Sequence, residues 1–197
     1  MPAAFRQNLV QRCLLGPLDT ANRPLGALVQ RGYAMLSDDV TPIKLETGSA
    51  PLAFSAFPRM RLSPDSAQQL GYAIDTLSRA HFVEKYLVPV ERFCPHSLPV
   101  HAIYALKIHA DASIQLEPVK FSERFALLGE NTYRYTFLEG FGLQQTHFRS
   151  VVQVAKTVNI STICRPASPF LLEQLVDTLE GEFGGPTTIS QDKKANL

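Results

Sequence analysis

One stretch, residues 14–40, constrains what this chain can fold into more than any other. A short apolar run is followed by an amphipathic run that stops at Gly32, and a second apolar run starts at once. Glycine directly after an amphipathic run is typical of a helix C-terminus, because glycine tolerates the positive φ needed there. The stretch predicts a first strand over 12–15, a helix over 25–31 and a second strand from Tyr33.

Two carboxylates, Asp38 and Asp39, lie at the end of the second apolar run. In open α/β sheets, ligands bind at the carboxyl ends of the strands, so the pair is expected at a binding edge. Adjacent carboxylates suit a magnesium nucleotide, because one can hold Mg²⁺ while the other takes a proton from an attacking hydroxyl. We therefore predict Asp38 and Asp39 as catalytic residues, with Asp39 as the metal ligand.

Composition limits the classes of protein to consider. A chain of 197 residues suffices for one domain, and a hydrophobic fraction of 45% suffices for a buried core. The net charge of +1 indicates no bias toward nucleic acid or an anionic membrane. No apolar run approaches the roughly 20 residues that span a bilayer. Three distant cysteines without a CxxC pair favour a cytoplasmic setting.

Two other chemistries lack their sequence signatures. The five histidines form no HExxH motif and no tight cluster with cysteine, which argues against a zinc site. No GxSxG elbow is present, which argues against a serine hydrolase. Nucleic-acid, membrane, zinc and serine-hydrolase functions are therefore set aside.

Downstream of the acidic pair, Arg59 and Arg61 alternate with two apolar residues. Both arginines should therefore lie on one face of an extended segment. That face either presents positive charge to phosphate or is a solvated face of an edge strand. The next residues, Ser63 and Pro64, fit the cap and the first position of a helix, which we expect to bury its apolar positions through Leu77.

The remaining segments predict a mixed architecture. Residues 100–108 and 113–119 are strand-like, and the turn residues between them favour a hairpin. The C-terminal third is mostly helical in pattern, with a short strand over 160–164 and a final amphipathic helix over 169–183. The fold class predicted is α/β, with a mixed sheet flanked by helices and a helical C-terminal third.

A series of motifs runs through most of the chain in a fixed order. They are Gly16-Pro17, residues 25–32, Ser37-Asp38-Asp39-Val40, and residues 57–66, 90–93, 116–119 and 122–125. In this order they resemble the kinase core of the HPr kinase/phosphorylase family, and more closely its shorter HPr-kinase-like bacterial relatives. The resemblance implies the P-loop fold that this family shares with phosphoenolpyruvate carboxykinase.

The resemblance also implies a function, an ATP-dependent serine kinase that uses Mg²⁺ and phosphorylates a small protein or a precursor peptide. The nucleotide would meet four positions after the first strand, namely Gly16, Pro17, Asn22 and Arg23. Arg59 and Arg61 would contact phosphate. Residues 1–184 would form the catalytic domain, truncated at its start, and residues 185–197 a flexible tail. Assembly into a homo-oligomer is left open.

The phosphate loop departs from the family pattern at its decisive positions. Relatives carry GPSGxGKST, whereas this chain reads Gly-Pro-Leu-Asp-Thr-Ala-Asn-Arg-Pro over 16–24. Asn22 stands where a lysine would reach the β- and γ-phosphates, and Arg23 stands where a hydroxyl would bind magnesium. Asp19 replaces a glycine of the phosphate cradle. We therefore expect this loop not to hold ATP in the usual way.

Two explanations of the loop stay open, and two function classes follow. Read one base out of frame, a coding string for Ser-Gly-His-Gly-Lys-Ser-Thr gives the sequence of residues 18–24, so one lost and one gained base would scramble an intact loop. The other explanation is divergence of a disused loop. The chain is then either an HPr-kinase-like serine kinase with an impaired phosphate loop, or a non-catalytic pseudokinase or partner-binding module that retains the fold.

Overall fold

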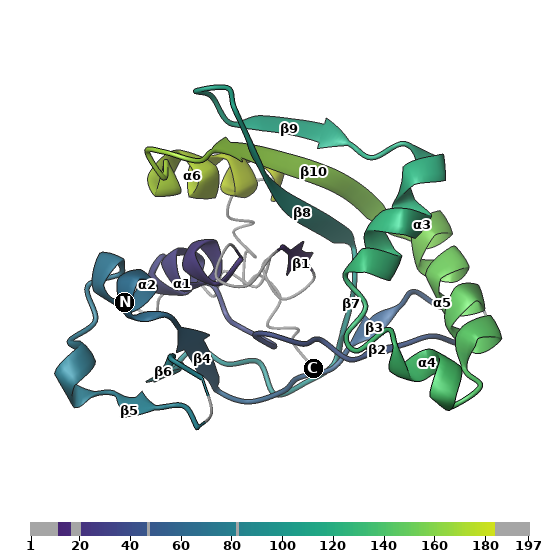
Figure 1. Ribbon diagram of the computed structural model, residues 1–197, viewed down its shortest axis with the longest axis horizontal. Coiled ribbons are helices and arrows are strands. Elements are labelled where there is room, and N and C mark those ends of the chain that lie inside the picture. The colour runs from purple at the N-terminus through teal and green to yellow at the C-terminus, as the bar shows by residue number, and fades with distance from the viewer. Residues whose placement is uncertain (1–11, 17–20, 47, 82, 184–197) are drawn as a thin grey trace, which may run out of the picture.

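The computed structural model describes residues 12–16, 21–46, 48–81 and 83–183. This part of the chain is an α/β protein with a four-stranded sheet, two three-stranded sheets and helices around them (Figure 1). Its first elements are β1 (Arg12–Leu15), α1 (Asn22–Gln30), β2 (Ile43–Lys44), β3 (Leu52–Ala53), β4 (Arg59–Leu62), α2 (Pro64–Gln69), η2 (Ile74–Thr76), β5 (Ser78–Arg79) and β6 (Tyr86–Pro89). The later elements are β7 (Leu98–Pro99), β8 (Ala102–His109), β9 (Gln115–Pro118), α3 (Phe121–Glu130), α4 (Phe137–Gly140), α5 (Gln144–Thr157), β10 (Asn159–Pro166) and α6 (Leu172–Glu182).

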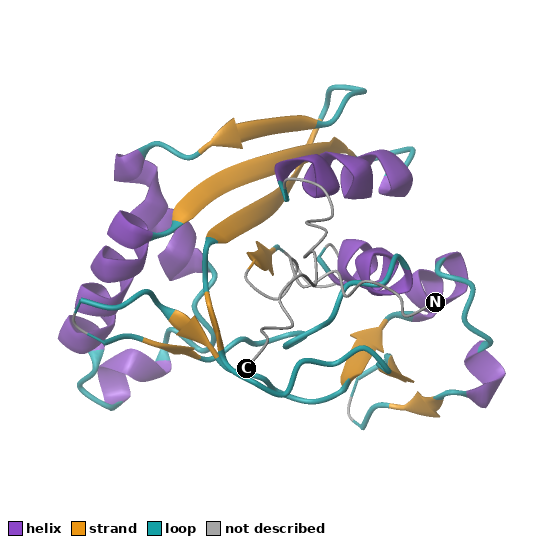
Figure 2. Ribbon diagram, turned by 180° about the vertical axis from the view of Figure 1, so that it is seen from behind, coloured by secondary structure: helices purple, strands orange, loops and turns teal. Residues whose placement is uncertain are grey.

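The main sheet has the order β1-β8-β10-β9. Strands β1, β8 and β10 are parallel, and β9 runs antiparallel to β10 (Figure 2). In this register Leu15 lies opposite Ala105, and Arg165 lies opposite Ile108. The carboxyl ends of the three parallel strands therefore meet along one edge, where β1 leads into α1.

Strand β8 is buried on both faces, as its continuous apolar sequence favours. Tyr104 and Leu106 belong to the core cluster that α1 and α6 share, whereas Ile103 and Ala105 belong to the cluster under α3 and α5. Alternate side chains thus enter opposite layers of helices. Figure 1 shows α1 beside α6, and α3 beside α5.

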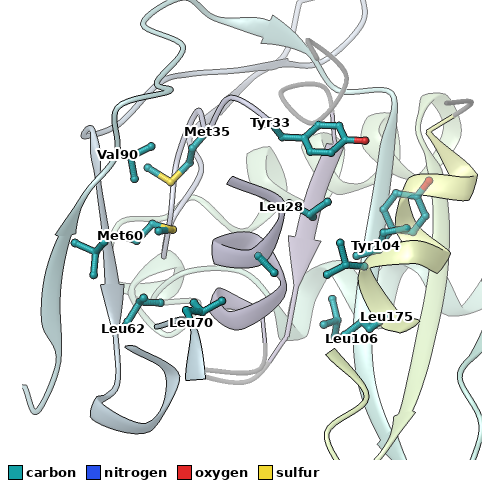
Figure 3. Packing of buried hydrophobic residues seen from close by; sticks show 14 of the residues in the cluster. Leu28, Tyr33, Met35, Met60, Leu62, Leu70, Val90, Tyr104, Leu106 and Leu175 are labelled. Carbon is teal, nitrogen blue, oxygen red and sulfur yellow. The ribbon is translucent and has the colours of Figure 1, made fainter. Parts of the chain in front are cut away.

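Helix α1 lies between the main sheet and the small sheet β4-β6-β5 (Figure 3). Its Leu28 is fully buried, with Met60 and Leu62 on the side of the small sheet and Tyr104 and Leu175 on the side of the main sheet. Burying a leucine or methionine side chain of this kind contributes about 1.5–3 kcal/mol. This packing fixes α1, and with it the end of the helix that faces the acidic pair.

The predicted stop of α1 is confirmed. Gly32 has a φ of 97°, its N–H bonds the carbonyl of Val29, and the N–H of Tyr33 bonds the carbonyl of Leu28 at 3.1 Å. These two bonds form a Schellman motif, which satisfies carbonyls at the end of the helix. The helix starts earlier than predicted, at Asn22. Its first turn tolerates the proline at position 24, because the backbone N–H that proline lacks would have no partner within the helix there.

The segment after β4 follows the prediction at its start and departs from it later. Ser63 caps α2 by accepting from the N–H of Ser66 at 3.3 Å, and Pro64 occupies the first helical position. The single helix expected through Leu77 is wrong, because α2 ends at Gln69 and Gly71 has a φ of 78°. Leu77 still packs against the core from the turn that follows.

The predicted second strand from Tyr33 is reduced to single bridge positions at Tyr33 and Met35. Met35 pairs with Phe93, and its N–H and carbonyl bond the carbonyl of Arg92 and the N–H of Cys94 at 2.9 and 2.8 Å. After this bridge the Ser37 hydroxyl donates to the Val40 carbonyl at 2.6 Å, which turns the chain. The segment is buried and extended, and it still leads directly to the carboxylates.

The predicted hairpin of 100–108 with 113–119 is wrong. Strand β10 lies between β8 and β9 and pairs with both. It pairs with β8 along all of its eight residues, whereas β9 has only four. The long parallel ladder between two apolar strands displaces the local hairpin, and β9 becomes the edge of the sheet.

The C-terminal third is mostly helical, as predicted, with α3, α4, α5 and α6 around the long strand β10. The predicted tail of residues 185–197 and the end of the predicted domain at residue 184 lie outside the described residues. In the described part of the chain, no helix combines the length and the apolar character that crossing a membrane requires.

Candidate functional site

Four segments that are distant in sequence converge at the acidic pair. The turn after residue 36 supplies Asp38 and Asp39, the first residue of α1 supplies Asn22, β4 supplies Arg61, and the residue before β6 supplies Lys85. Arg61 is the link between the two carboxylates, because its backbone N–H meets one and its guanidinium meets the other. The structure thus brings together three of the residues predicted for the site, namely Asp38, Asp39 and Arg61.

Asp38 is a half-buried residue whose carboxylate has one shielded, unpaired oxygen. Its Oδ2 accepts a 2.7 Å hydrogen bond from the Arg61 N–H. Its Oδ1 is shielded from solvent and has no hydrogen-bond partner within the described residues. The pKa of Asp38 is raised from 3.8 to about 6, chiefly by burial and also by the charge of Asp39, against the opposing effect of the Arg61 N–H. A carboxylate with this pKa can exchange a proton near neutral pH.

Asp39 has the opposite environment. Its Oδ2 lies 3.2 Å from Nη1 of Arg61, and its Oδ1 lies 3.8 Å from Nζ of Lys85. The amide of Asn22 approaches Oδ1 at 3.5 Å. Asp39 is thus paired with two cations, whereas the surroundings of Asp38 favour its neutral form. Carboxylate pairs whose environments differ in this way are typical of sites in which one group moves a proton and the other stays charged.

The acidic pair has the oxygen ligands that a hard cation such as magnesium takes. Magnesium is usually held by one or two carboxylates together with substrate phosphates and water, and Asp38 and Asp39 supply that number of carboxylates. Among the described residues, no three side chains of His, Cys, Asp or Glu come together as a candidate metal cluster. Asp39 would have to exchange part of its contact with Arg61 and Lys85 for the metal.

Asn22 and Arg23, two of the predicted nucleotide contacts, are bonded within the protein. The amide of Asn22 donates to the carbonyl of Arg61 at 2.9 Å, and the residue is 8% exposed. Arg23 donates from Nε to the hydroxyl of Ser66 at 3.1 Å and pairs with Asp65 on α2. Neither side chain fits the phosphate-binding role that a lysine and a hydroxyl would have there.

The other predicted contacts lie in different places. Gly16 follows β1 at the carboxyl edge of the main sheet, and Pro17 lies outside the described residues. Arg59 shares the exposed face of β4 with Arg61, as predicted. Its guanidinium lies 5.2 Å from the ring centroid of Phe57, whereas the acidic pair is contacted by Arg61.

Two hollows of different size adjoin the site. A cavity of about 60 Å³ is lined by Asp38, Asn22, Ser37 and Leu14 among others. It has room for a few water molecules, whereas pockets for small-molecule ligands measure about 300–1,000 Å³. A larger hollow of about 450 Å³ is lined by Lys85 and Arg79 among others. Lys85 therefore contacts Asp39 and also lines the larger hollow.

Sequence reasoning missed one basic residue of the site, Lys85. It lies in an ordinary polar stretch between two short strands, and nothing in its spacing connects it with Asp39. The contact becomes visible only once the fold brings the start of β6 to the acidic pair.

Comparison with family models, with curated proteins and with solved structures finds no match to this chain. The resemblance to HPr-kinase-like proteins therefore stays a proposal. It depends on the motifs of the sequence and on the residues that the fold brings to Asp38 and Asp39.

Proposed function

We propose that this chain is an HPr-kinase-like, ATP-dependent serine kinase whose phosphate loop grips the nucleotide weakly. The observation that carries the proposal is the unequal environment of the two adjacent carboxylates. Asp38 has a buried, unpaired oxygen, and Asp39 is held between Arg61 and Lys85. Serine phosphorylation needs both a proton acceptor and a fixed negative charge for the metal, and this pair offers one of each.

The two carboxylates then have separate roles. When bound, Mg-ATP would supply the phosphoryl group. The serine oxygen would bond to the γ-phosphorus while the bond between the γ-phosphorus and the bridging oxygen of ADP breaks. Asp38 takes the proton of the serine hydroxyl, because with a pKa of about 6 it is largely ionised at pH 7. Asp39 would hold the metal ion, and in the resting protein it lies between Arg61 and Lys85.

A specific observation favours a second candidate, a non-catalytic module that binds a partner. Asn22 and Arg23, which occupy the positions of the phosphate-binding lysine and hydroxyl, are bonded to Arg61 and Asp65 instead. These contacts tie α1 to β4 and α2, so the loop residues stabilise the fold. In this reading the acidic pair persists as a partly exposed polar feature without catalytic use.

Titration calorimetry with Mg-ATP tests the proposal. Micromolar binding that is lost in Asp39→Ala and kept in Asp75→Ala, an exposed aspartate in η2, supports the kinase. If the wild-type chain binds no nucleotide at millimolar concentration, the non-catalytic module is the better description.

A second experiment separates a damaged loop from a damaged site. In a variant that replaces residues 18–24 by Ser-Gly-His-Gly-Lys-Ser-Thr, the phosphate grip of the family pattern is restored. We expect this variant to bind Mg-ATP at least tenfold more tightly than the wild-type chain. The same variant with Asp39→Ala added should lose the gain. A restored loop without any gain in affinity would contradict the assignment of Asp38 and Asp39 to a nucleotide site.

A further inference from the structure

Large apolar side chains gather on the surface around the turn that follows α3. Between residues 133 and 148, six of them are 45–73% exposed. We call these six residues the aromatic surface: Tyr133, Tyr135, Phe137, Phe141, Leu143 and Phe148. A single exposed apolar residue needs no explanation, but a group of large ones marks a site of interaction.

Ring contacts join members of the aromatic surface. Phe137 and Phe141, at the two ends of α4, have ring centroids 6.4 Å apart. Tyr135 meets the imidazole of His147 edge-on, with centroids 5.6 Å apart, and α4 packs against α5. The aromatic surface therefore extends over the turn after α3, over α4 and over the start of α5 (Figure 1).

Arg134 lies among these rings in a strained backbone conformation. Its φ is 50°, in the left-handed region that residues other than glycine seldom adopt. Its Cζ atom lies 5.2 Å from the ring centroids of both Tyr133 and Phe137. Strained residues concentrate at functional sites, and aromatic residues and arginine are the types enriched in the cores of protein–protein interfaces.

The aromatic surface is as large as the apolar part of a stable protein–protein interface. An aromatic side chain buries about 200 Å² when it is fully covered, so six large side chains that are about half exposed leave roughly 600 Å². The largest apolar patch of a typical monomer measures about 300–600 Å². A standard interface takes about 800 Å² from each partner, and only a little over half of that area is apolar.

The charges of the same segment are balanced. Residues 130–149 contain two exposed acidic side chains, Glu130 and Glu139, and two exposed basic side chains, Arg134 and Arg149. The segment therefore does not favour a strongly charged partner, and it does not repel a copy of itself. Interfaces between identical copies are also more apolar than interfaces that form and dissociate.

We propose that the aromatic surface is the contact between two copies of this chain, related by a twofold axis. Arg134 and the rings of Tyr133 and Phe137 form its core. Figures 1 and 2 place α4 on the opposite side of the molecule from β4, the strand that supplies Arg61 to the acidic pair. Pairing through the aromatic surface therefore leaves the candidate site of each copy open.

Sedimentation equilibrium of the full chain, without nucleotide or magnesium, tests this inference independently of the proposed kinase function. The chain should form a dimer with a dissociation constant of about 10 µM or lower. The mass should stop at two copies, because a twofold contact closes on itself. The Tm should rise with protein concentration, because dimerisation stabilises the folded chain by mass action.

Phe141→Glu places a charge at the most exposed position of the aromatic surface, where the phenylalanine is 73% exposed. This variant should weaken the dimer about tenfold or more and remove the concentration dependence of the Tm. Phe57→Glu is the matched control, because Phe57 is 64% exposed and lies outside the aromatic surface, before β4. The control should associate as the wild type does.

Arg134→Gly separates a role in the contact from a role in the fold. Glycine adopts a φ of 50° readily, so the dilute variant should unfold at the same or a higher Tm. Because the variant lacks the guanidinium between the rings, its dimer should be about fivefold weaker or more. Association as tight as that of the wild type would contradict the place of Arg134 in the core.

The inference is overturned if the wild-type chain stays a monomer, which would assign the aromatic surface to a partner other than a second copy. It is also overturned if the chain forms a series of larger aggregates without a discrete dimer, or if Phe141→Glu dimerises as tightly as the wild type.

Discussion

The side-chain amide of Asn22 donates a 2.9 Å hydrogen bond to the backbone carbonyl of Arg61. Arg61 in turn donates its backbone N–H to Asp38 and its guanidinium to Asp39. The residue at the position of the phosphate-binding lysine is therefore connected, through β4, to both carboxylates of the site. A change at position 22 acts on the fold and on the acidic pair together.

We expect Asn22→Ala to destabilise the protein by about 1–3 kcal/mol, because the carbonyl of Arg61 loses its buried donor. Urea unfolding monitored by circular dichroism gives the change in the free energy of unfolding. Asn131→Ala is the matched control, since that amide also donates to a backbone carbonyl, that of Leu127, but from an exposed residue at the end of α3. Equal losses in the two variants would show that the contact with Arg61 has no special weight.

Asp38→Asn should stabilise the folded protein by about 2 kcal/mol at pH 8. The folded-state pKa is raised, from 3.8 to about 6, so the unfolded chain releases its proton first. The contribution of Asp38 to stability is thus fully present below pH 3.8 and is lost as the pH rises through about 6. Asparagine keeps an acceptor for the Arg61 N–H and does not ionise.

The pH dependence provides the check on Asp38. The free energy of unfolding is measured for the wild type and Asp38→Asn from pH 4 to pH 8, and their difference should grow across the titration. Any kinase activity should rise with pH through about 6 and be lost in the variant. A constant difference across the range would contradict a raised pKa for Asp38.

Arg31→Met should lower the free energy of unfolding by about 1–2 kcal/mol at low salt. Arg31, next to the end of α1, contacts three carboxylates of α6, with Asp177 at 2.6 Å and Glu180 at 2.7 Å. Networks outperform isolated surface pairs, and methionine retains the apolar stem. The loss of unfolding free energy should be smaller in concentrated sodium chloride than in low salt, because salt screens exposed charges. Lys44→Met removes an exposed isolated pair with Glu46 and should leave stability unchanged at both salts.

Gly32→Ala should destabilise the protein by about 1–2 kcal/mol, because its φ of 97° is costly for alanine. Steric contact is a minor part, since an added Cβ would lie 3.5 Å from Nη1 of Arg92, an ordinary contact distance. Gly140→Ala in α4 meets no neighbour within 4 Å and has no positive φ. It should be neutral or slightly stabilising. The difference in Tm between the two variants, measured by thermal unfolding, gives the cost of the positive φ at position 32.

Local chemistry allowed much of the fold to be predicted from the sequence. Gly32 ends α1 because the positive φ and the two hydrogen bonds of the motif involve only neighbouring residues. Ser63 caps α2 for the same reason. The alternation that exposes Arg59 and Arg61 follows from the period of a strand. Each of these features depends on a few consecutive residues, so one sequence suffices to recognise it.

Long-range pairing could not be predicted in this way. The apolar run of β8 and the turn after it are compatible with a hairpin, and only the arrival of β10 excludes that pairing. The residues of the candidate site show the same difference between local and long-range contacts. Asp38 and Asp39 are adjacent in sequence and were found together, whereas Lys85 reaches Asp39 across 46 positions.

The place of β10 in the main sheet also sets when the protein can fold during synthesis. Strands β1, β8 and β9 leave the ribosome well before Asn159–Pro166, which is the strand that joins β8 to β9. Until then β8 and β9 each carry an edge without its final partner, and such edges pair readily with other chains. Sheets closed by distant segments also form slowly, because long loops must close first. A ribosome that pauses before residue 159 would therefore hold a nascent chain prone to aggregation, for which a chaperone is the natural protection.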